Sequence, residues 1–228
     1  MDIKTVNDSL DVINKQFSTL IFSTQYLATS NKISWNNYSP GIYKGFTYIK
    51  EYSEIIDSRQ YSFLLKDKSL FQFYYEWDDG VLLKAKLAYY PFPGSLILEA
   101  DDLFDHIDEL NDLDALENNY EDELLQLATE NNSTIISTNS SHLRLDYDPN
   151  AQSHPICHLQ FGALNEIRIA SLKLLNPMCF THWLLEQVFK NSSINFTALK
   201  KSPEFLYLKN RNCNTDITND LVAMDIIL

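Results

Sequence analysis

Side chains suited to a core recur at intervals of three and four residues over the first part of the chain. They are Val6, Leu10, Ile13, Phe17, Leu20, Thr24 and Leu27. Because an α-helix turns once every 3.6 residues, this spacing brings all of them to one face. The pattern predicts a single amphipathic helix over residues 6–27, buried along that face. A weaker repeat predicts a second helix over residues 42–56.

The next part of the chain has the composition and punctuation of β-strands. Apolar and aromatic runs occupy residues 61–65, 70–77 and 81–90. Asp79-Gly80 separates the last two runs, and this dipeptide is a strong signal for a two-residue hairpin turn. Alternation in the last run predicts Val81, Leu83, Ala85 and Leu87 on the inner face of the strand, with Lys84 and Lys86 on the outer face.

A second group of strands and a last helix are predicted further along. Alternation marks residues 141–147, 156–161 and 166–170, which predicts an antiparallel meander of three strands. Asn176-Pro177 is a typical helix start, and the apolar residues after it predict a helix. Helices followed by strands, and then by more strands and a helix, predict an α+β fold with a mostly antiparallel sheet.

The length of 228 residues and an apolar content of 45% suit one large domain. Within residues 1–228 we expect a helical N-terminal part over residues 1–58 and a sheet core over residues 61–190. An acidic helical insert over residues 99–130 interrupts that core. Residues 191–228 are expected to form a C-terminal extension.

Charge is distributed unevenly along the chain. Residues 87–143 hold 13 Asp or Glu and no Lys or Arg, which leaves 18 acids and 18 bases elsewhere. Such a block stays solvated and attracts basic surfaces, so we expect a protein partner with a basic surface. Binding of duplex DNA through the block is excluded, because both are negative. The expected partner contacts are Asp101, Asp102, Asp105, Asp108 and Glu109, with Lys84 and Lys86 outside the block.

No segment has the features of a signal peptide, and no window holds 18 uninterrupted apolar residues. We therefore expect a cytoplasmic protein without a membrane span. Cys157, Cys179 and Cys213 are far apart and odd in number, which favours reduced thiols over a disulfide framework. Phosphate-binding and dinucleotide-binding glycine motifs are absent from the sequence, so no cofactor is predicted.

The second group of strands also predicts a polar sheet face. Side chains that alternate with the apolar ones gather there if the strands are neighbours. They are the catalytic candidates His142, Arg144, Asp146, His158 and Arg168, with Gln160 and Glu166 beside them. Imidazoles transfer protons near neutral pH, a guanidinium binds phosphate, and a carboxylate orients an imidazole. The alternative is a solvated face of paired charges without chemistry.

His154 and His158 are candidate metal ligands as well. Their spacing of four residues resembles a ligand pair, and Asp146 could join them. The zincin pattern, however, needs a helix and an intervening glutamate, and this segment has neither. The sequence therefore does not assign a metal.

Five ordered blocks resemble an uncharacterised bacterial family, domain-of-unknown-function 2290. They are DKSLFQF (67–73), LAYYPFP (87–93), SHLRLDYDP (141–149), HPICHLQFG (154–162) and residues 176–189. The likeness covers residues 61–189. Lys68 stands where the family pattern has glycine, and Lys84-Ala85-Lys86 stands where it has a His-Arg pair. The resemblance implies a bacterial or phage-related origin and an association with mobile and antiphage loci, and it implies no activity.

Two functions remain open at this point. The leading hypothesis is a non-enzymatic interaction or regulatory subunit of a bacterial multi-protein system, such as one for antiphage defence. The acidic block and the long amphipathic helix motivate it. The alternative is a phosphodiester hydrolase or nuclease that uses His142, Arg144, Asp146 and His158. The sequence does not decide whether the protein is an enzyme, and it does not predict an oligomeric state.

Overall fold

The computed structural model describes residues 1–39, 47–97, 134–137, 139–162, 168–189, 194–215 and 223–224, and ten strands in these ranges form one sheet. In chain order they are β1 (Ile21–Thr24), β2 (Tyr26–Ala28), β3 (Lys32–Trp35), β4 (Phe63–Leu65), β5 (Leu70–Asp78), β6 (Val81–Tyr90), β9 (Leu143–Tyr147), β10 (Cys157–Phe161), β11 (Arg168–Ser171) and β14 (Ala223–Met224). Their spatial order is β1-β4-β5-β6-β9-β10-β11-β14, and β3 joins β2 to β5.

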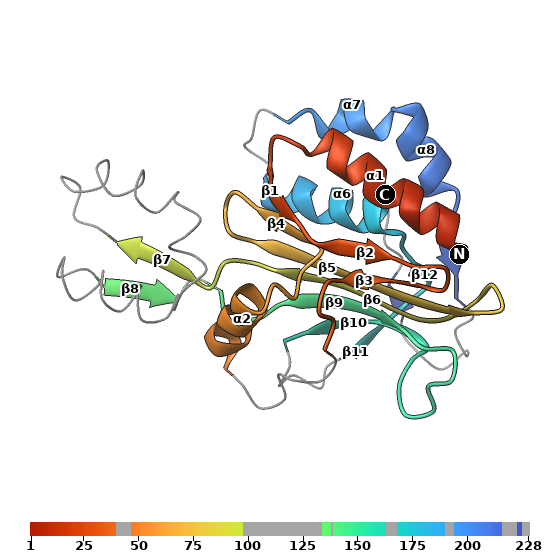
Figure 1. Cartoon of the computed structure of the whole chain (residues 1–228), viewed down its shortest axis with the longest axis horizontal. Coiled ribbons are helices and arrows are strands. Elements are labelled where there is room, and N and C mark those ends of the chain that lie inside the picture. The colour runs from red at the N-terminus through yellow and green to blue at the C-terminus, as the bar shows by residue number, and fades with distance from the viewer. Residues whose placement is uncertain are drawn as a thin grey trace.

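Five helices accompany the sheet in the described ranges. They are α1 (Ile3–Gln16), α2 (Tyr48–Asp57), α6 (Pro177–Val188), α7 (Phe196–Lys200) and α8 (Pro203–Lys209). Figure 1 shows α1, α6, α7 and α8 grouped on one side of the sheet, with α2 apart from them. The sheet pairings are antiparallel except for that of β11 with β14. The predicted α+β class is therefore confirmed.

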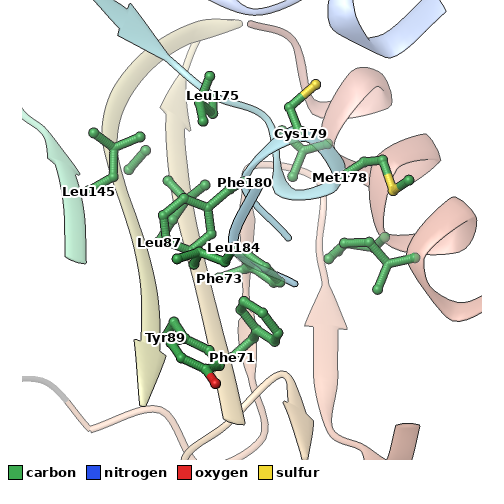
Figure 2. Packing of buried hydrophobic residues seen from close by; sticks show 14 of the residues in the cluster. Phe71, Phe73, Leu87, Tyr89, Leu145, Leu175, Met178, Cys179, Phe180 and Leu184 are labelled. Atoms are coloured by element: carbon green, nitrogen blue, oxygen red, sulfur yellow. The ribbon is translucent and has the colours of Figure 1, made fainter. Parts of the chain in front are cut away.

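The main core lies between the sheet and this group of helices. Phe180 of α6 meets Phe71 and Phe73 of β5 edge-on, with ring centroids 6.3 Å apart in both pairs. Figure 2 shows Phe180 and Leu184 beside Phe73 and Leu87. All of these side chains are buried. Tilted and edge-on aromatic pairs add to the stabilisation that burial of their area provides.

The predicted first helix is correct only in its first half. Val6, Leu10, Ile13 and Phe17 are buried in the main core, but the helix ends at Gln16. A turn follows in which the Leu20 amide donates to the Phe17 carbonyl, and residues 21–28 then form β1 and β2. This second segment is rich in β-branched and aromatic residues, and it fills the sheet edge by pairing with β4 and β3. Tertiary pairing thus overrides a spacing that also fits a helix.

The predicted β5–β6 hairpin is confirmed. Asp79 and Gly80 have φ angles of 45° and 79°, the positive values that a type I′ turn requires at both central positions. The expected inner position of Val81 and Leu83 is wrong, because a bulge opposite Glu76 and Trp77 shifts the alternation by one residue. Leu82 is therefore buried, whereas Val81 and Leu83 are 64% and 36% exposed.

The other predicted elements are found with shifted ends. The meander of β9, β10 and β11 is confirmed, and α6 begins after an Asn176 side chain that accepts from the Cys179 amide. Of the predicted second helix, residues 48–57 form α2, and residues 42–46 lie outside the described ranges. The predicted acidic insert, residues 99–130, lies outside them too. In the described part of the chain, no helix is both long and apolar enough to span a bilayer.

The described part of the predicted C-terminal extension packs on the main core. Phe196, Phe205 and Leu208 of α7 and α8 are buried with α1 and α6. The Asn176 side chain donates to the Leu208 carbonyl over 2.8 Å, which ties the start of α6 to α8. Cys213 and Asn214 continue from there as β13, which pairs with β12 (Lys173–Leu174).

We predict that Leu10→Asp lowers the free energy of unfolding by about 3–5 kcal/mol, because it buries an unpaired carboxylate between α1 and the core. Chemical denaturation measures this change. Asn14→Asp introduces the same side chain on the exposed face of α1, and its effect should stay within about 0.5 kcal/mol. Equal stability of the two variants would contradict the position of Leu10 in the core.

Candidate functional site

The register of the central strands brings the predicted polar residues together on the second sheet face. Lys86 lies directly opposite Asp146, and Asp146 lies opposite His158. Directly opposite residues point to the same side of a sheet. The next row places Arg144 opposite Gln160 and Gln160 opposite Arg168. We call the set Lys84, Lys86, Arg144, Asp146, His158, Gln160 and Arg168 the polar band.

Arg144 is held in a fixed orientation at the centre of the polar band. Its Nε donates to Asp146 Oδ2 over 2.9 Å, and its Nη2 donates to Gln160 Oε1 over 3.0 Å. These two bonds use two of the five N–H donors of a guanidinium. The side chain is about one quarter exposed. Arg144 is therefore both a structural tie between β9 and β10 and a partly accessible cation.

Lys86 is the most desolvated cation of the polar band. Burial lowers the pKa of its ammonium group, and the Asp146 carboxylate opposite partly restores that pKa. Lys84 lies at the end of the band, where it faces Glu76 across the β5–β6 ladder. Both lysines share the outer face of β6, as the sequence predicted.

His158 is buried, and its hydrogen bond defines its protonation. Its Nδ1 lies 3.0 Å from the Pro155 carbonyl oxygen, which can only accept, so the proton is on Nδ1. Nε2 of the neutral ring then carries the lone pair. Burial lowers the pKa of His158, against the smaller opposing effects of this bond and of Asp146. The ring is thus held neutral near physiological pH.

His154 lies next to His158, as the metal hypothesis requires. The ring centroids are 4.7 Å apart, and His154 Nδ1 also lies 3.1 Å from the Pro155 carbonyl oxygen. Across the described ranges, however, no group of three or more His, Cys, Asp or Glu side chains is arranged to hold a metal ion. The two histidines are therefore a pair without a third ligand among the described residues.

His142 occupies a different environment from the rest of the predicted face. It is 1% exposed beneath α2, with its ring 4.6 Å from that of Tyr90. Its Nδ1 lies 3.5 Å from Glu51 Oε2, and Tyr90 donates its hydroxyl to the other oxygen of Glu51 over 3.1 Å. A solvated position for His142 is therefore wrong, because α2 covers this end of the sheet. His142, Glu51 and Tyr90 form a buried polar cluster.

Sequence reasoning missed Glu51 and Tyr90 as polar partners of His142. A signal for Glu51 was present in the helix pattern. It lies three residues after Tyr48 and four before Ile55, on the face of α2 that packs against the sheet. An acidic residue at a core position indicates a buried polar partner. Nothing in the sequence marked Tyr90 as a buried polar partner, because tyrosine is common in strands.

The remaining acidic candidates are not described by the structure, and two of the three cysteines are buried. Asp101, Asp102, Asp105, Asp108 and Glu109 lie outside the described residues, and so does Glu166. The three cysteines are free thiols. Burial raises the pKa of Cys157 to about 12 and that of Cys179 to about 11, so neither forms a nucleophilic thiolate at neutral pH.

We predict that His142→Ala lowers the free energy of unfolding by about 2–4 kcal/mol, since it leaves the buried Glu51 without its neighbour. Arg144→Ala, in the partly exposed polar band, should cost about 1 kcal/mol or less. Urea denaturation of both variants measures the difference. An Arg144 variant less stable than the His142 variant would contradict the assignment of His142 to the buried cluster.

A second prediction concerns pH. His182 is a buried residue of α6. Since burial lowers the pKa of His158 and of His182 in the folded protein, the unfolded chain binds protons first as the pH falls. Stability should therefore be complete above about pH 6.5 and decrease as the pH is lowered towards 5. His158→Gln and His182→Gln should each flatten this decrease in denaturation series at pH 7, 6 and 5. An unchanged slope in both variants would oppose the prediction.

The comparisons with known proteins address the family and not the activity. A family model described as an uncharacterised conserved protein, DUF2290, matches residues 16–223. The match extends the likeness expected for residues 61–189 in both directions and includes the polar band. No curated protein and no solved structure matches the chain. Because the family model covers most of its length, the chain belongs to the DUF2290 family of uncharacterised conserved proteins.

Proposed function

We propose that the chain is a non-enzymatic interaction or regulatory subunit that binds a protein with a basic surface through residues 98–133. This segment holds 13 Asp or Glu and no Lys or Arg. Attraction between such a segment and a basic surface accelerates encounter and weakens as salt rises. The net charge of −13 equals the contribution of this one segment.

One observation supports the proposal above all: the ends of the acidic segment are paired outside the main sheet. β7 (Gly94–Ile97) and β8 (Thr134–Ser137) form a separate antiparallel ribbon in which Ile97 lies opposite Thr134. Figure 1 shows this ribbon extending away from one end of the main sheet. The residues that flank the segment, Ile97 and Thr134, are therefore neighbours in a ribbon that is separate from the main sheet.

The polar band favours the same interpretation. Arg144 donates to both Asp146 and Gln160, and His158 is bonded to the Pro155 carbonyl. Side chains that satisfy each other in this way are typical of the polar face of an antiparallel sheet. Their orientation is set by these bonds to neighbouring groups of the fold.

The alternative, a phosphodiester hydrolase, has one specific observation in its favour. Neutral His158 carries its lone pair on Nε2, and Asp146 lies opposite in the ladder with Arg144 bonded to it. A base, an orienting carboxylate and a phosphate-binding cation are the groups that such chemistry uses. Assays of the purified protein on single-stranded and duplex nucleic acids, combined with metal analysis, separate this function from the first.

The partner and the cellular context stay predictions. A bacterial multi-protein system, such as one for antiphage defence, is the context that the family resemblance implies. Purification of the tagged full chain from its native host, followed by mass spectrometry, identifies a partner. A basic partner surface is the outcome that we expect.

We predict that the acidic segment is required for binding and dispensable for folding. Because Ile97 and Thr134 are directly paired, an Asn-Gly turn can replace residues 98–133 and close the ribbon as a hairpin. The shortened chain should unfold with a free energy within about 1 kcal/mol of the full chain, since it loses none of the main core. Its association with the purified partner should be abolished.

A milder variant tests the charge alone. Replacement of Asp101, Asp102, Asp105 and Asp108 by Asn should slow association about tenfold at low salt and change dissociation little. The matched control replaces Asp11, Asp57 and Asp78 by Asn and Glu204 by Gln, all on exposed positions of the main body. Stopped-flow or surface-based kinetics at several salt concentrations measure both sets. Equal effects of the two sets would reject a specific role for the segment.

A further inference from the structure

The two links that join the ribbon to the sheet pass beside α2. The first link, Pro91 to Pro93, follows β6, and Tyr48 of α2 donates its hydroxyl to the Pro91 carbonyl. Phe92 of the same link meets the Tyr52 ring edge-on, with centroids 5.9 Å apart. The Lys68 ammonium lies 5.4 Å from the centre of the Phe92 ring. The first link is thus held by several unlike contacts.

The second link leads from β8 to β9 and is bonded to the first. The Asn139 side chain donates to the Phe92 carbonyl over 2.7 Å, and the Asn139 amide donates to the Pro93 carbonyl. Three residues later the chain reaches His142, the residue beside Glu51 of α2. Contacts from α2 therefore reach both links. We call the place where these two links leave the main sheet the root of the ribbon.

The buried cluster lies at this root. Tyr90 is the last residue of β6 before the first link, and His142 is the last residue of the second link before β9. Glu51 accepts from Tyr90 and faces His142, so one carboxylate contacts the residue at the end of each link. Among the described residues, the Glu51 carboxylate from α2 and the Tyr90 ring from β6 face His142. A buried carboxylate between two links resists their separation, because separation would leave it unpaired.

The ribbon needs such a support. Its strands have four residues each, and an isolated two-stranded hairpin is at best marginally stable in water. We propose that Glu51 and Tyr48 of α2 are positioning residues that hold the root of the ribbon at the end of the main sheet. The effect of these residues on partner binding rests on the proposed function. Their effect on the stability of the ribbon does not.

Fixing the root of the ribbon has a consequence for binding. A partner that binds next to a ribbon with a fixed root orders less of the chain than a partner that binds next to a loose ribbon. Weakening the root therefore reduces affinity for the partner without removing any carboxylate of the segment. The positioning residues themselves need not touch the partner.

Hydrogen exchange measured by mass spectrometry tests the root without any partner. In Glu51→Ala and in Tyr48→Phe, amides of residues 91–97 and 134–140 should exchange about tenfold faster, whereas amides of β5 and α6 keep their rates. Glu51→Gln retains an acceptor for Tyr90 and should restore most of the protection. Unchanged exchange in the ribbon in both Glu51→Ala and Tyr48→Phe would overturn the inference, whatever the partner experiments give.

Two controls separate positioning from general destabilisation. Ile55→Ala removes a fully buried side chain of the same helix and lowers overall stability, but leaves the contacts of Glu51 and Tyr48 in place. Glu54→Ala removes a carboxylate from the less buried face of α2. Neither should accelerate exchange in the ribbon selectively. With the purified partner, Glu51→Ala should raise Kd about fivefold and Ile55→Ala should not. Equal exchange in Glu51→Ala and Ile55→Ala would show a merely structural role and reject the inference.

Discussion

The antiparallel ladder of β5, β6 and β9 is the constraint on which the rest of the structure depends. Its register places Phe73, Leu87 and Leu145 in one row, directed into the main core. The neighbouring row holds Lys86 and Asp146, directed to the other face. A slip by one residue would exchange the two faces and bury the charges without partners. The hydrophobic core therefore fixes the sheet face on which the side chains of the polar band lie.

The two faces of this sheet are covered unequally, and this difference separates two kinds of polar group. In the described part of the chain, α1, α6, α7 and α8 cover the first face, whereas α2 covers one end of the second. Under α2 the histidine, carboxylate and phenol of the buried cluster are stabilising groups of the interior. Beyond α2 the polar band is partly exposed, and its cationic side chains, Lys84, Lys86, Arg144 and Arg168, surround the single carboxylate of Asp146. Histidines that look alike in sequence thus differ in their expected roles.

The sequence predicted those features that depend on local chemistry. The β5–β6 hairpin follows from Asp79-Gly80, and the start of α6 follows from the capping by Asn176. Period-two alternation correctly placed Arg144 and Asp146 on one face. The features that it missed depend on tertiary contacts. The spacing of Leu20 and Leu27 fits a helix, but pairing at the sheet edge makes strands of this segment. Burial of His142 depends on α2, which lies about 90 residues earlier in the chain.

The central claim of this account is that the protein meets its partner through the acidic segment on the ribbon. Carbodiimide crosslinking of the complex isolated from the native host tests it most directly, because the reagent joins carboxylates to lysines in direct contact. The account predicts that crosslinked peptides come mainly from residues 98–133, attached to lysines of the partner. Crosslinks confined to carboxylates of the main body, such as Asp11 or Glu204, with residues 98–133 unmodified, would contradict it.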